Sequence, residues 1–233
     1  LGTTRIVLQS FRDIARPVPL VCNAHYYVPC VHLRQLGRPH AARCHSLAQL
    51  TMMHDPTGDA TALVQAQMYS YRSLMLFRLL KESPLATRES LHLMQALAPA
   101  FVIWAVEEED RPAPERFCRL AARADGGTVL EVVAPESPEA GRQRLGPRRT
   151  LRRAMRALGC WPIREVHSGP GSSLHYGGQF PASERDEPFT TASDGRLHGT
   201  RRVFVADGSA FRYLPAKGLT FTLMANADRI ATA

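Results

Sequence analysis

A histidine beside two glycines is the first group in this sequence that could do chemistry. His175 stands in Leu174-His175-Tyr176-Gly177-Gly178, directly before a glycine pair that favours a tight turn. A histidine side chain titrates near neutral pH and suits general base work, although an isolated histidine is more often structural. Its chemistry therefore depends on what the fold brings beside it.

A second group of interest follows about thirty residues later. Residues 203–205 predict a buried strand that ends at Asp207 and Gly208, and an apolar helix is expected from about Thr220. In α/β proteins, a strand end that faces a helix start is where phosphates and cofactors bind. A histidine just before a glycine turn could reach such a site.

The segment Gly169-Pro170-Gly171-Ser172-Ser173-Leu174 half resembles a dinucleotide-binding fingerprint. It fails at Leu174, because the fingerprint needs a glycine there to relieve the contact between helix and strand. No clear acidic residue closes a second strand further on. We interpret this segment as a connecting loop rich in Gly and Pro.

The front of the chain is rich in Cys and His, which are zinc ligands. The residues concerned are Cys22, His25, Cys30, His32, His40, Cys44, His45 and His54. Structural zinc sites usually present paired knuckles two to five residues apart, and only Cys22-x-x-His25 comes close to that spacing. Buried cysteines and scattered histidines are the favoured interpretation, with a zinc-binding module as a weaker alternative.

The formal net charge of +8 comes almost wholly from arginine. One stretch concentrates it around a predicted helix, and its members are Arg142, Arg144, Arg148, Arg149, Arg152, Arg153 and Arg156. A basic helix face is ordinarily just solvated, and no interleaved aromatic residue offers bases a stacking platform. We expect no nucleic-acid partner, and a non-enzymatic module that binds an acidic partner through this face stays as the alternative.

Residues 174–233 resemble, in order and spacing, the C-terminal signature of the glucose/methanol/choline (GMC) family of FAD-dependent oxidoreductases. The resemblance rests on His175-x-x-Gly178, on the segment from Val203 to Ser209, and on the closing helix Phe221-Thr222-Leu223-Met224-Ala225-Asn226-Ala227-Asp228-Arg229-Ile230-Ala231. Upstream it is looser, with residues 1–8 similar to a helix of the family's flavin domain and residues 64–133 to its antiparallel substrate domain.

The resemblance implies a flavoenzyme that oxidises a small-molecule alcohol with FAD. His175 would be the catalytic base that takes the hydroxyl proton, while the carbinol carbon passes a hydride to flavin N5. The implied cofactor-binding residues are Asp207, Gly208, Gly218, Leu219 and Thr220. The start of the last helix would place a positive dipole end against the flavin edge that becomes negative on reduction.

Two positions depart from the family's pattern. The family usually carries a second His or Asn at the position of Gly218, and a proline where this chain has Arg212. Either His175 acts alone, helped by a tyrosine such as Tyr176 or Tyr213, or the activity is altered. The GxGxxG unit that would cradle the pyrophosphate is absent from these 233 residues, so we expect weak or no flavin binding and no catalysis by the chain alone.

The elements that must position these residues predict an α+β fold. We expect an antiparallel-sheet substrate domain covered by helices, together with the C-terminal part of a Rossmann-like FAD-binding domain. The predicted division is residues 1–20 as the tail end of an FAD-domain segment, residues 21–146 as the substrate domain, and residues 147–233 as the segment that carries His175 and returns to the FAD domain.

Several elements are predicted individually. Strands are expected over residues 64–68, 101–106 and 161–166, and helices near residues 74–80, 91–98 and 147–159. Thr3 or Thr4 could cap a first helix. Residues 117–133 predict a hairpin with a type I′ turn, because Asp125-Gly126 supplies the positive φ angles that this turn demands.

Composition sets the broad class of the protein. The chain has 233 residues, 45% of them apolar, and no apolar run approaches the roughly 20 residues that a membrane span needs. We expect a soluble, cytoplasmic protein. The sequence opens at Leu1 with neither an initiator Met nor a signal segment, so we expect it to start within a longer protein or after a removed segment. The five widely spaced cysteines favour a reducing compartment over a disulfide framework.

Overall fold

The fold is α+β and divides into two compact units. The structure is a computed structural model that describes residues 1–11, 16–38, 48–58, 60, 62–70, 83–135, 145–167, 169 and 171–232. Within these residues there are four α-helices, and the ladders between the named strands are antiparallel. The predicted fold class is therefore confirmed at this coarse level.

The two units interleave along the chain. Unit 1 comprises Leu1–Ala24, Glu108–Pro138 and Ser168–Ala233, and unit 2 comprises His25–Glu107 and Glu139–His167. The predicted domains are consecutive segments, whereas these units are built from separate stretches. All the residues that the resemblance singles out, from His175 to Thr220, belong to unit 1.

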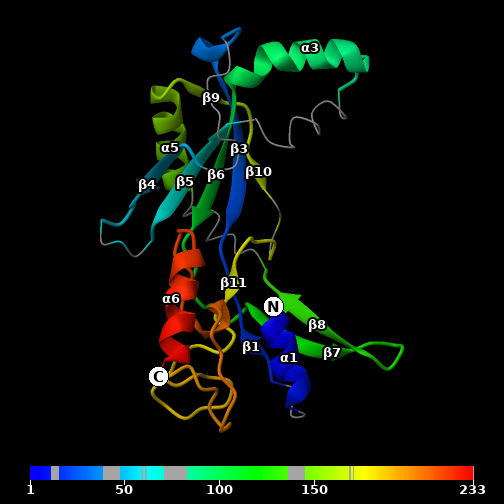
Figure 1. Ribbon diagram of the computed structural model, residues 1–233, viewed down its shortest axis with the longest axis vertical. Helices are drawn as coiled ribbons and strands as arrows, with labels where there is room; N and C mark the ends of the chain where they lie inside the picture. Colours follow the sequence, from blue (N-terminus) through cyan, green and yellow to red (C-terminus); the bar gives the residue numbers. More distant parts are fainter. Residues whose placement is uncertain are drawn as a thin grey trace. The chain divides into compact units, whose positions relative to one another are not determined.

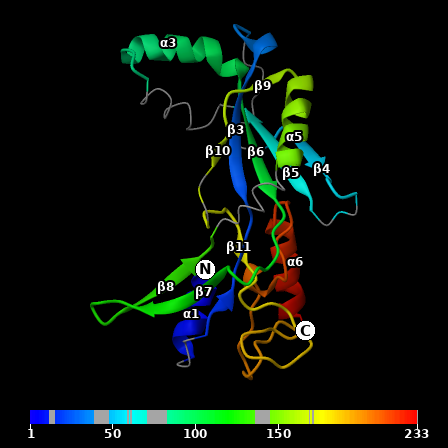
Figure 2. The ribbon, with the colours of Figure 1, turned by 180° about the vertical axis from the view of Figure 1, so that it is seen from behind.

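Unit 2 is built on a six-stranded sheet. Its strand order is β10-β3-β6-β5-β4, with β9 paired to β3 beside that path. The bounds are β3 His25–His32, β4 Leu50–His54, β5 Val64–Ser70, β6 Phe101–Glu108, β9 Cys160–Pro162 and β10 Val166–His167. Figures 1 and 2 show these strands with helix α5 alongside them. The central pair β3 and β6 is fully laddered from His25 opposite Glu107 to Val31 opposite Phe101.

Helix α5, Leu145–Ala157, closes the core of unit 2. Its apolar positions Leu151 and Met155 are buried against Trp104 and Cys30 of the sheet, as helical spacing predicts. The helix ends at Ala157, and Gly159 follows with a φ of +81°, the left-handed conformation that commonly terminates a helix. The described part of this unit also contains α3 Thr87–Leu97 and the short 3₁₀ turns η1 Leu33–Gln35 and η2 Ala98–Ala100.

Unit 1 combines two small sheets with two helices. The sheets are β1-β7-β8 and β11-β2, with β1 Val18–Pro19, β2 Val21–Cys22, β7 Phe117–Ala122, β8 Thr128–Val133 and β11 Tyr176–Gly177. The helical elements are α1 Gly2–Ser10, the 3₁₀ turn η3 Gly208–Ala210, and α6 Thr220–Ala231. Its main core gathers Leu8, Leu20, Cys118 and Phe180 from all three stretches of the unit.

The predicted hairpin over residues 117–133 is confirmed, but its predicted turn is wrong. The ladder ends where Ala122 lies opposite Thr128, and Arg123 N–H donates to the Gly127 carbonyl at 2.8 Å. Only Gly126 has a positive φ, +81°, while Asp125 instead accepts a hydrogen bond from Gly127 N–H at 3.0 Å. A three-residue loop with a left-handed glycine satisfies the strand twist as well as a type I′ turn does.

Three other local predictions also differ from the structure. Residues 203–205 form no strand, since only Phe204 makes an isolated bridge, to Arg196. The strand predicted over 161–166 is split into β9 and β10, because residues 163–165 stand opposite only residues 28 and 29 of β3 and one extra residue interrupts the ladder. Thr3 lies inside α1, whose N-cap is Leu1.

The predicted strands at 64–68 and 101–106 and the predicted helices at 91–98 and 147–159 are confirmed as β5, β6, α3 and α5. The helix predicted near 74–80 lies outside the described residues. Among the described helices, none combines the length and the apolar character needed to cross a bilayer.

The packing of α5 can be tested with two substitutions on the same helix end. Met155→Ala should lower the free energy of unfolding by about 2–5 kcal/mol, because Met155 is 1% exposed and its removal leaves a cavity against the sheet. Leu158→Ala, at a position 45% exposed, should change it by no more than about 0.5 kcal/mol. Urea denaturation of both variants measures the difference, and equal losses would contradict the described core.

Candidate functional site

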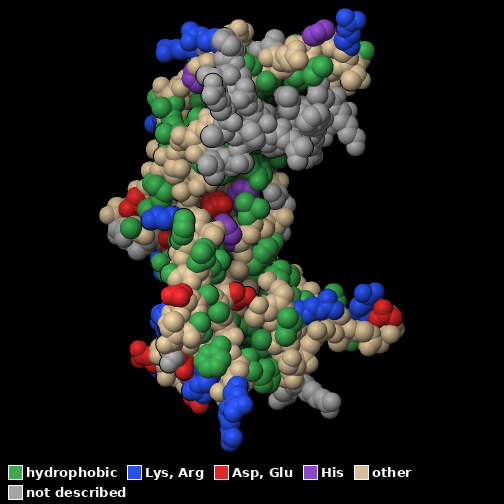
Figure 3. All heavy atoms as spheres, in the orientation of Figure 1, with side chains coloured by type: hydrophobic (Ala, Val, Ile, Leu, Met, Phe, Trp, Pro, Cys, Tyr) green, Lys and Arg blue, Asp and Glu red, His purple; other side chains and the backbone are tan. Residues whose placement is uncertain are grey.

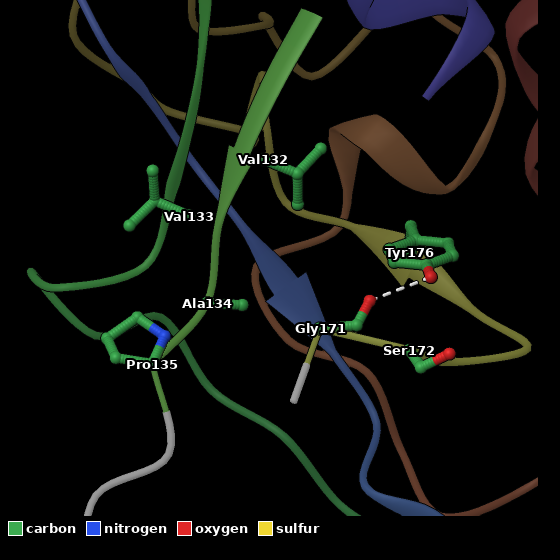
Figure 4. Close-up of a pocket in the computed structure, with 7 residues that line it drawn as sticks. All are labelled: Val132, Val133, Ala134, Pro135, Gly171, Ser172 and Tyr176. Atoms are coloured by element: carbon green, nitrogen blue, oxygen red, sulfur yellow. Dashed lines mark hydrogen bonds between the residues drawn. The ribbon is translucent and has the colours of Figure 1, made fainter. Parts of the chain in front are cut away.

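His175 lies in a loop that hydrogen bonds close upon itself. His175 N–H donates to Ser173 Oγ at 3.1 Å, and Ser173 N–H donates to the Tyr176 hydroxyl oxygen at 3.0 Å. The Tyr176 hydroxyl in turn donates to the Gly171 carbonyl at 2.8 Å (Figure 4). The conformation of the loop before β11 is therefore set locally, and His175 is half-buried within it.

A backbone seam joins this loop to the turn after Asp207. Gly178 N–H donates to the Gly208 carbonyl at 3.1 Å, Phe180 N–H to Ser209 at 2.8 Å, and Ala182 N–H to Ala210 at 3.0 Å. On its other side β11 pairs with β2, where Tyr176 lies opposite Cys22. The structure thus brings the predicted catalytic histidine and the predicted Asp207-Gly208 turn side by side.

The seam is close enough that two positions must be glycine. A Cβ on Gly177 would lie 2.5 Å from the Gly208 carbonyl oxygen, and a Cβ on Gly178 would lie 2.5 Å from Val21 Cγ2. Gly178 also has a φ of +79°, which other residues rarely adopt. The pair Gly177-Gly178 therefore permits the close contact with Gly208 and Val21, in addition to forming a turn.

Asp207 ties the seam to the first helix. Asp207 is the N-cap of η3, and its Oδ1 accepts hydrogen bonds from the N–H and hydroxyl of Ser209. Its Oδ2 accepts from the Thr3 hydroxyl at 2.6 Å. Burial raises the pKa of Asp207, but the hydrogen bonds from Ser209 and Thr3 outweigh it, so the pKa lies below its ordinary value. The carboxylate is thus held ionised, and its assignment to a cofactor stays a prediction.

Two buried polar residues anchor the chain that leads into α6. Asn23 Nδ2 donates to the carbonyls of Glu108 at 2.7 Å and Pro215 at 3.2 Å. Asp110 and Leu214 exchange two backbone hydrogen bonds of 2.9 Å, and the Asp110 carboxylate accepts from Cys22 N–H at 2.8 Å. Sequence reasoning missed Asn23 and Asp110, because their partners lie far away along the chain.

The start of α6 lies close to the same turn. Leu219 is buried with Val21 and Leu214, and Leu223 lies 3.7 Å from the position of a Cβ on Gly208. No side chain caps this helix, and Gly218 and Thr220 are exposed. Its first N–H groups therefore form an uncapped positive end that suits an anion or an electron-rich ring edge.

The two tyrosines considered as helpers of His175 have other contacts. The Tyr176 hydroxyl is committed to the loop on both sides, as donor and as acceptor. Tyr213 is exposed, and the Arg111 guanidinium lies 5.3 Å from its ring centroid. Tyr176 therefore holds the loop in its conformation, and its contacts do not indicate that it accepts the proton of the substrate hydroxyl group.

A cavity of about 650 Å³ opens beside the same loop. It is lined by Val132, Val133, Ala134 and Pro135 on one side and by Gly171, Ser172 and Tyr176 on the other (Figure 4). Its walls are apolar on the hairpin side and carry a hydroxyl on the loop side. A small molecule bound there would lie next to the segment that leads to His175.

The zinc alternative finds no support in the described residues. No group of three or more His, Cys, Asp or Glu side chains comes together among them, and His40, Cys44 and His45 lie outside that part of the chain. Burial raises the pKa of Cys30 to about 12 and that of Cys118 to about 11. These buried thiols are therefore protonated in the absence of a metal ion.

The arginine face of α5 is partly occupied by an internal partner. Glu165 lies 3.8 Å from both Arg148 and Arg152. Figure 3 shows Lys and Arg side chains scattered over the face in view, which suits a solvated surface. One exposed ring, Trp161, does lie beside Arg156, with 6.0 Å between guanidinium carbon and ring centroid.

Arg142 and Arg144 lie outside the described residues, so the alternative of a basic binding module keeps its status as a prediction.

Comparison with known proteins adds no relative to this picture. A scan against models of protein families finds no match to the chain, and a search of curated proteins finds no similar sequence. The class of protein that the fold itself defines is an α+β protein of two interleaved units.

The backbone seam can be tested at two glycines. Gly177→Ala should destabilise the protein by about 1–3 kcal/mol, because the added methyl group would force the Gly208 carbonyl away. Gly218→Ala, where nothing lies within 4 Å, should change stability by no more than about 0.5 kcal/mol. Chemical denaturation measures both, and an unaffected Gly177→Ala protein would refute the close approach.

The Asp207 contacts predict a pH-dependent contribution to stability. Because the folded pKa of Asp207 is lowered, its stabilisation is present above the unfolded pKa of about 4 and is lost as pH falls through the folded value. Asp207→Asn should cost about 1 kcal/mol at pH 7, since the group is partly solvated, and less in acid. Asp228→Asn on the exposed side of α6 is the control in urea titrations at pH 7 and pH 3. A loss that is the same at both pH values would contradict the role of the charge.

Proposed function

We propose that this chain is the C-terminal portion of an FAD-dependent alcohol oxidoreductase of the GMC type, in which His175 is the catalytic base. The observation that carries the proposal is the seam between residues 178–182 and 208–210. It places the histidine loop, the Asp207-Gly208 turn and the start of α6 in one unit, which is the set of groups that the resemblance implies. Unit 1 would then be the C-terminal part of a Rossmann-like domain, and unit 2 would be the substrate domain.

The residues present fit part of an FAD site. The start of α6 has no capping side chain, Gly218 and Thr220 are exposed on either side of the buried Leu219, and a Cβ on Gly218 would meet no atom within 4 Å. That combination suits the electron-rich edge of a ring system. These residues and the backbone at Gly208 would hold the cofactor, and the Asp207 carboxylate would act mainly by fixing Gly208.

The chemistry divides between cofactor and protein. When bound, FAD supplies the acceptor for a hydride from the carbinol carbon. His175 takes the proton of the substrate hydroxyl group, which is a step that an imidazole base performs in general base catalysis. The loop hydrogen bonds from Ser173 and Tyr176 keep the histidine backbone in place during that transfer.

The surface of α6 supports the placement of this unit within a larger flavin domain. Phe221 is 84% exposed and Met224 is 62% exposed, although both lie on a helix whose Leu223 reaches the seam. A helix that leaves such side chains in water has an apolar face without a cover in the described part of the chain. In the proposal, the pyrophosphate-binding βαβ unit that these 233 residues lack would cover it.

The proposal is tested in the natural protein that contains these residues together with a flavin-binding unit. Addition of a panel of primary and secondary alcohols should bleach its flavin spectrum. His175→Ala should slow that bleaching by about 10²- to 10⁴-fold without loss of bound flavin, because only the proton acceptor is removed. His92→Ala, on the exposed side of α3, is the matched control.

Two outcomes would overturn the proposal. A colourless protein that does not take up FAD would exclude a flavoenzyme. A flavin spectrum that alcohols bleach equally fast in the wild type and in His175→Ala would exclude the assigned base.

A further inference from the structure

A second cavity in unit 1 lies outside the proposed flavin site. It has a volume of about 590 Å³ and is lined by Phe11, Arg16, Asp186, Pro188, Phe189, Leu197, His198 and Gly199. That volume falls within the range of about 300–1,000 Å³ that is typical of small-molecule sites. None of the residues assigned to FAD or to catalysis contributes to its wall.

The apolar part of the wall is built around a strained phenylalanine. Phe189 has a φ of +62°, which costs a bulky residue on the order of 1–3 kcal/mol and persists only where surrounding contacts enforce it. Its ring meets Phe11 edge-on at 6.3 Å between centroids and Phe180 at 6.3 Å. Backbone strain of this kind is concentrated at functional positions. The strained residue here, Phe189, lines the cavity.

One acidic group of the wall is paired within the wall. His198 Nδ1 lies 3.0 Å from Asp186 Oδ1, and His198 Nε2 faces the Ser183 carbonyl at 3.3 Å. Both ring nitrogens of His198 therefore lie near an acceptor, and Asp186 has a hydrogen-bonding partner within the wall.

Two donors of the wall are available to a ligand. Within the described part of the chain, Arg16 takes part in no hydrogen bond or ion pair, and its side chain is at an exposed position. Gly199 stands at the third position of the turn that Thr200 N–H closes onto Leu197, with a φ of +76°, and its N–H makes no backbone hydrogen bond among the described residues. A guanidinium and a turn N–H are the donors that carboxylates accept from.

We propose that this cavity binds a small carboxylate with an aromatic or similarly sized apolar body. The guanidinium of Arg16 holds the carboxylate group, and the rings of Phe11 and Phe189 contact the apolar body. The site is independent of the flavin, so it stands or falls separately from the proposed oxidoreductase activity.

Phenylacetate and its uncharged counterpart phenylacetamide test the proposal. In titrations of the purified protein followed by NMR or calorimetry, phenylacetate should bind saturably and phenylacetamide about tenfold more weakly, since one charge-assisted contact contributes about 1.4 kcal/mol or more. Arg16→Gln should remove this preference. Arg202→Gln, at an exposed position outside the cavity, should keep it.

A third variant examines the apolar contact. Phe11→Leu should weaken both probes several-fold and leave their ratio unchanged, because it removes a ring and no charge. Circular dichroism verifies that each variant is folded. Equal affinities for acid and amide, an unchanged preference in Arg16→Gln, or no saturable binding of either probe to the wild type would each overturn the proposal.

Discussion

The close approach of Gly177 to the carbonyl oxygen of Gly208 is the constraint on which the candidate site depends. A side chain at either glycine of the pair Gly177-Gly178 would come within 2.5 Å of its neighbours, so the three hydrogen bonds of the seam form only with glycine there. His175 stands two residues before this contact. The backbone position of His175 is consequently set by main-chain geometry.

Buried polar groups extend that constraint to the rest of unit 1. Asn23 and Asp110, which are 2% and 7% exposed, bind backbone groups of stretches nearly two hundred and about one hundred residues away along the chain. Arg116 pairs with Asp110 at 2.7 Å and compensates its charge. Because an unsatisfied buried polar group is costly, these contacts select one arrangement of the three stretches and so fix where α6 begins.

The two candidate sites of unit 1 use different physical devices. At the proposed flavin site, the start of α6 has no capping side chain, and the backbone seam joins the Asp207-Gly208 turn to the loop that carries His175. At the second cavity, a strained Phe189 and the His198 to Asp186 pair shape a wall with an arginine at an exposed position. Strain and exposed donors cost stability, and the aromatic and polar contacts around them offset that cost.

Local pattern in the sequence determined the elements that depend on few neighbours. The spacing of Leu151 and Met155 was sufficient for α5, alternation was sufficient for β5, and the glycines at 126 and 127 were sufficient for a hairpin, because periodicity and turn chemistry act over a few residues. Only the tertiary structure decided that residues 203–205 are no strand, that Thr3 reaches Asp207, and that Asn23 holds residue 215. Those outcomes rest on contacts between stretches far apart in the chain, whose energies no local pattern encodes.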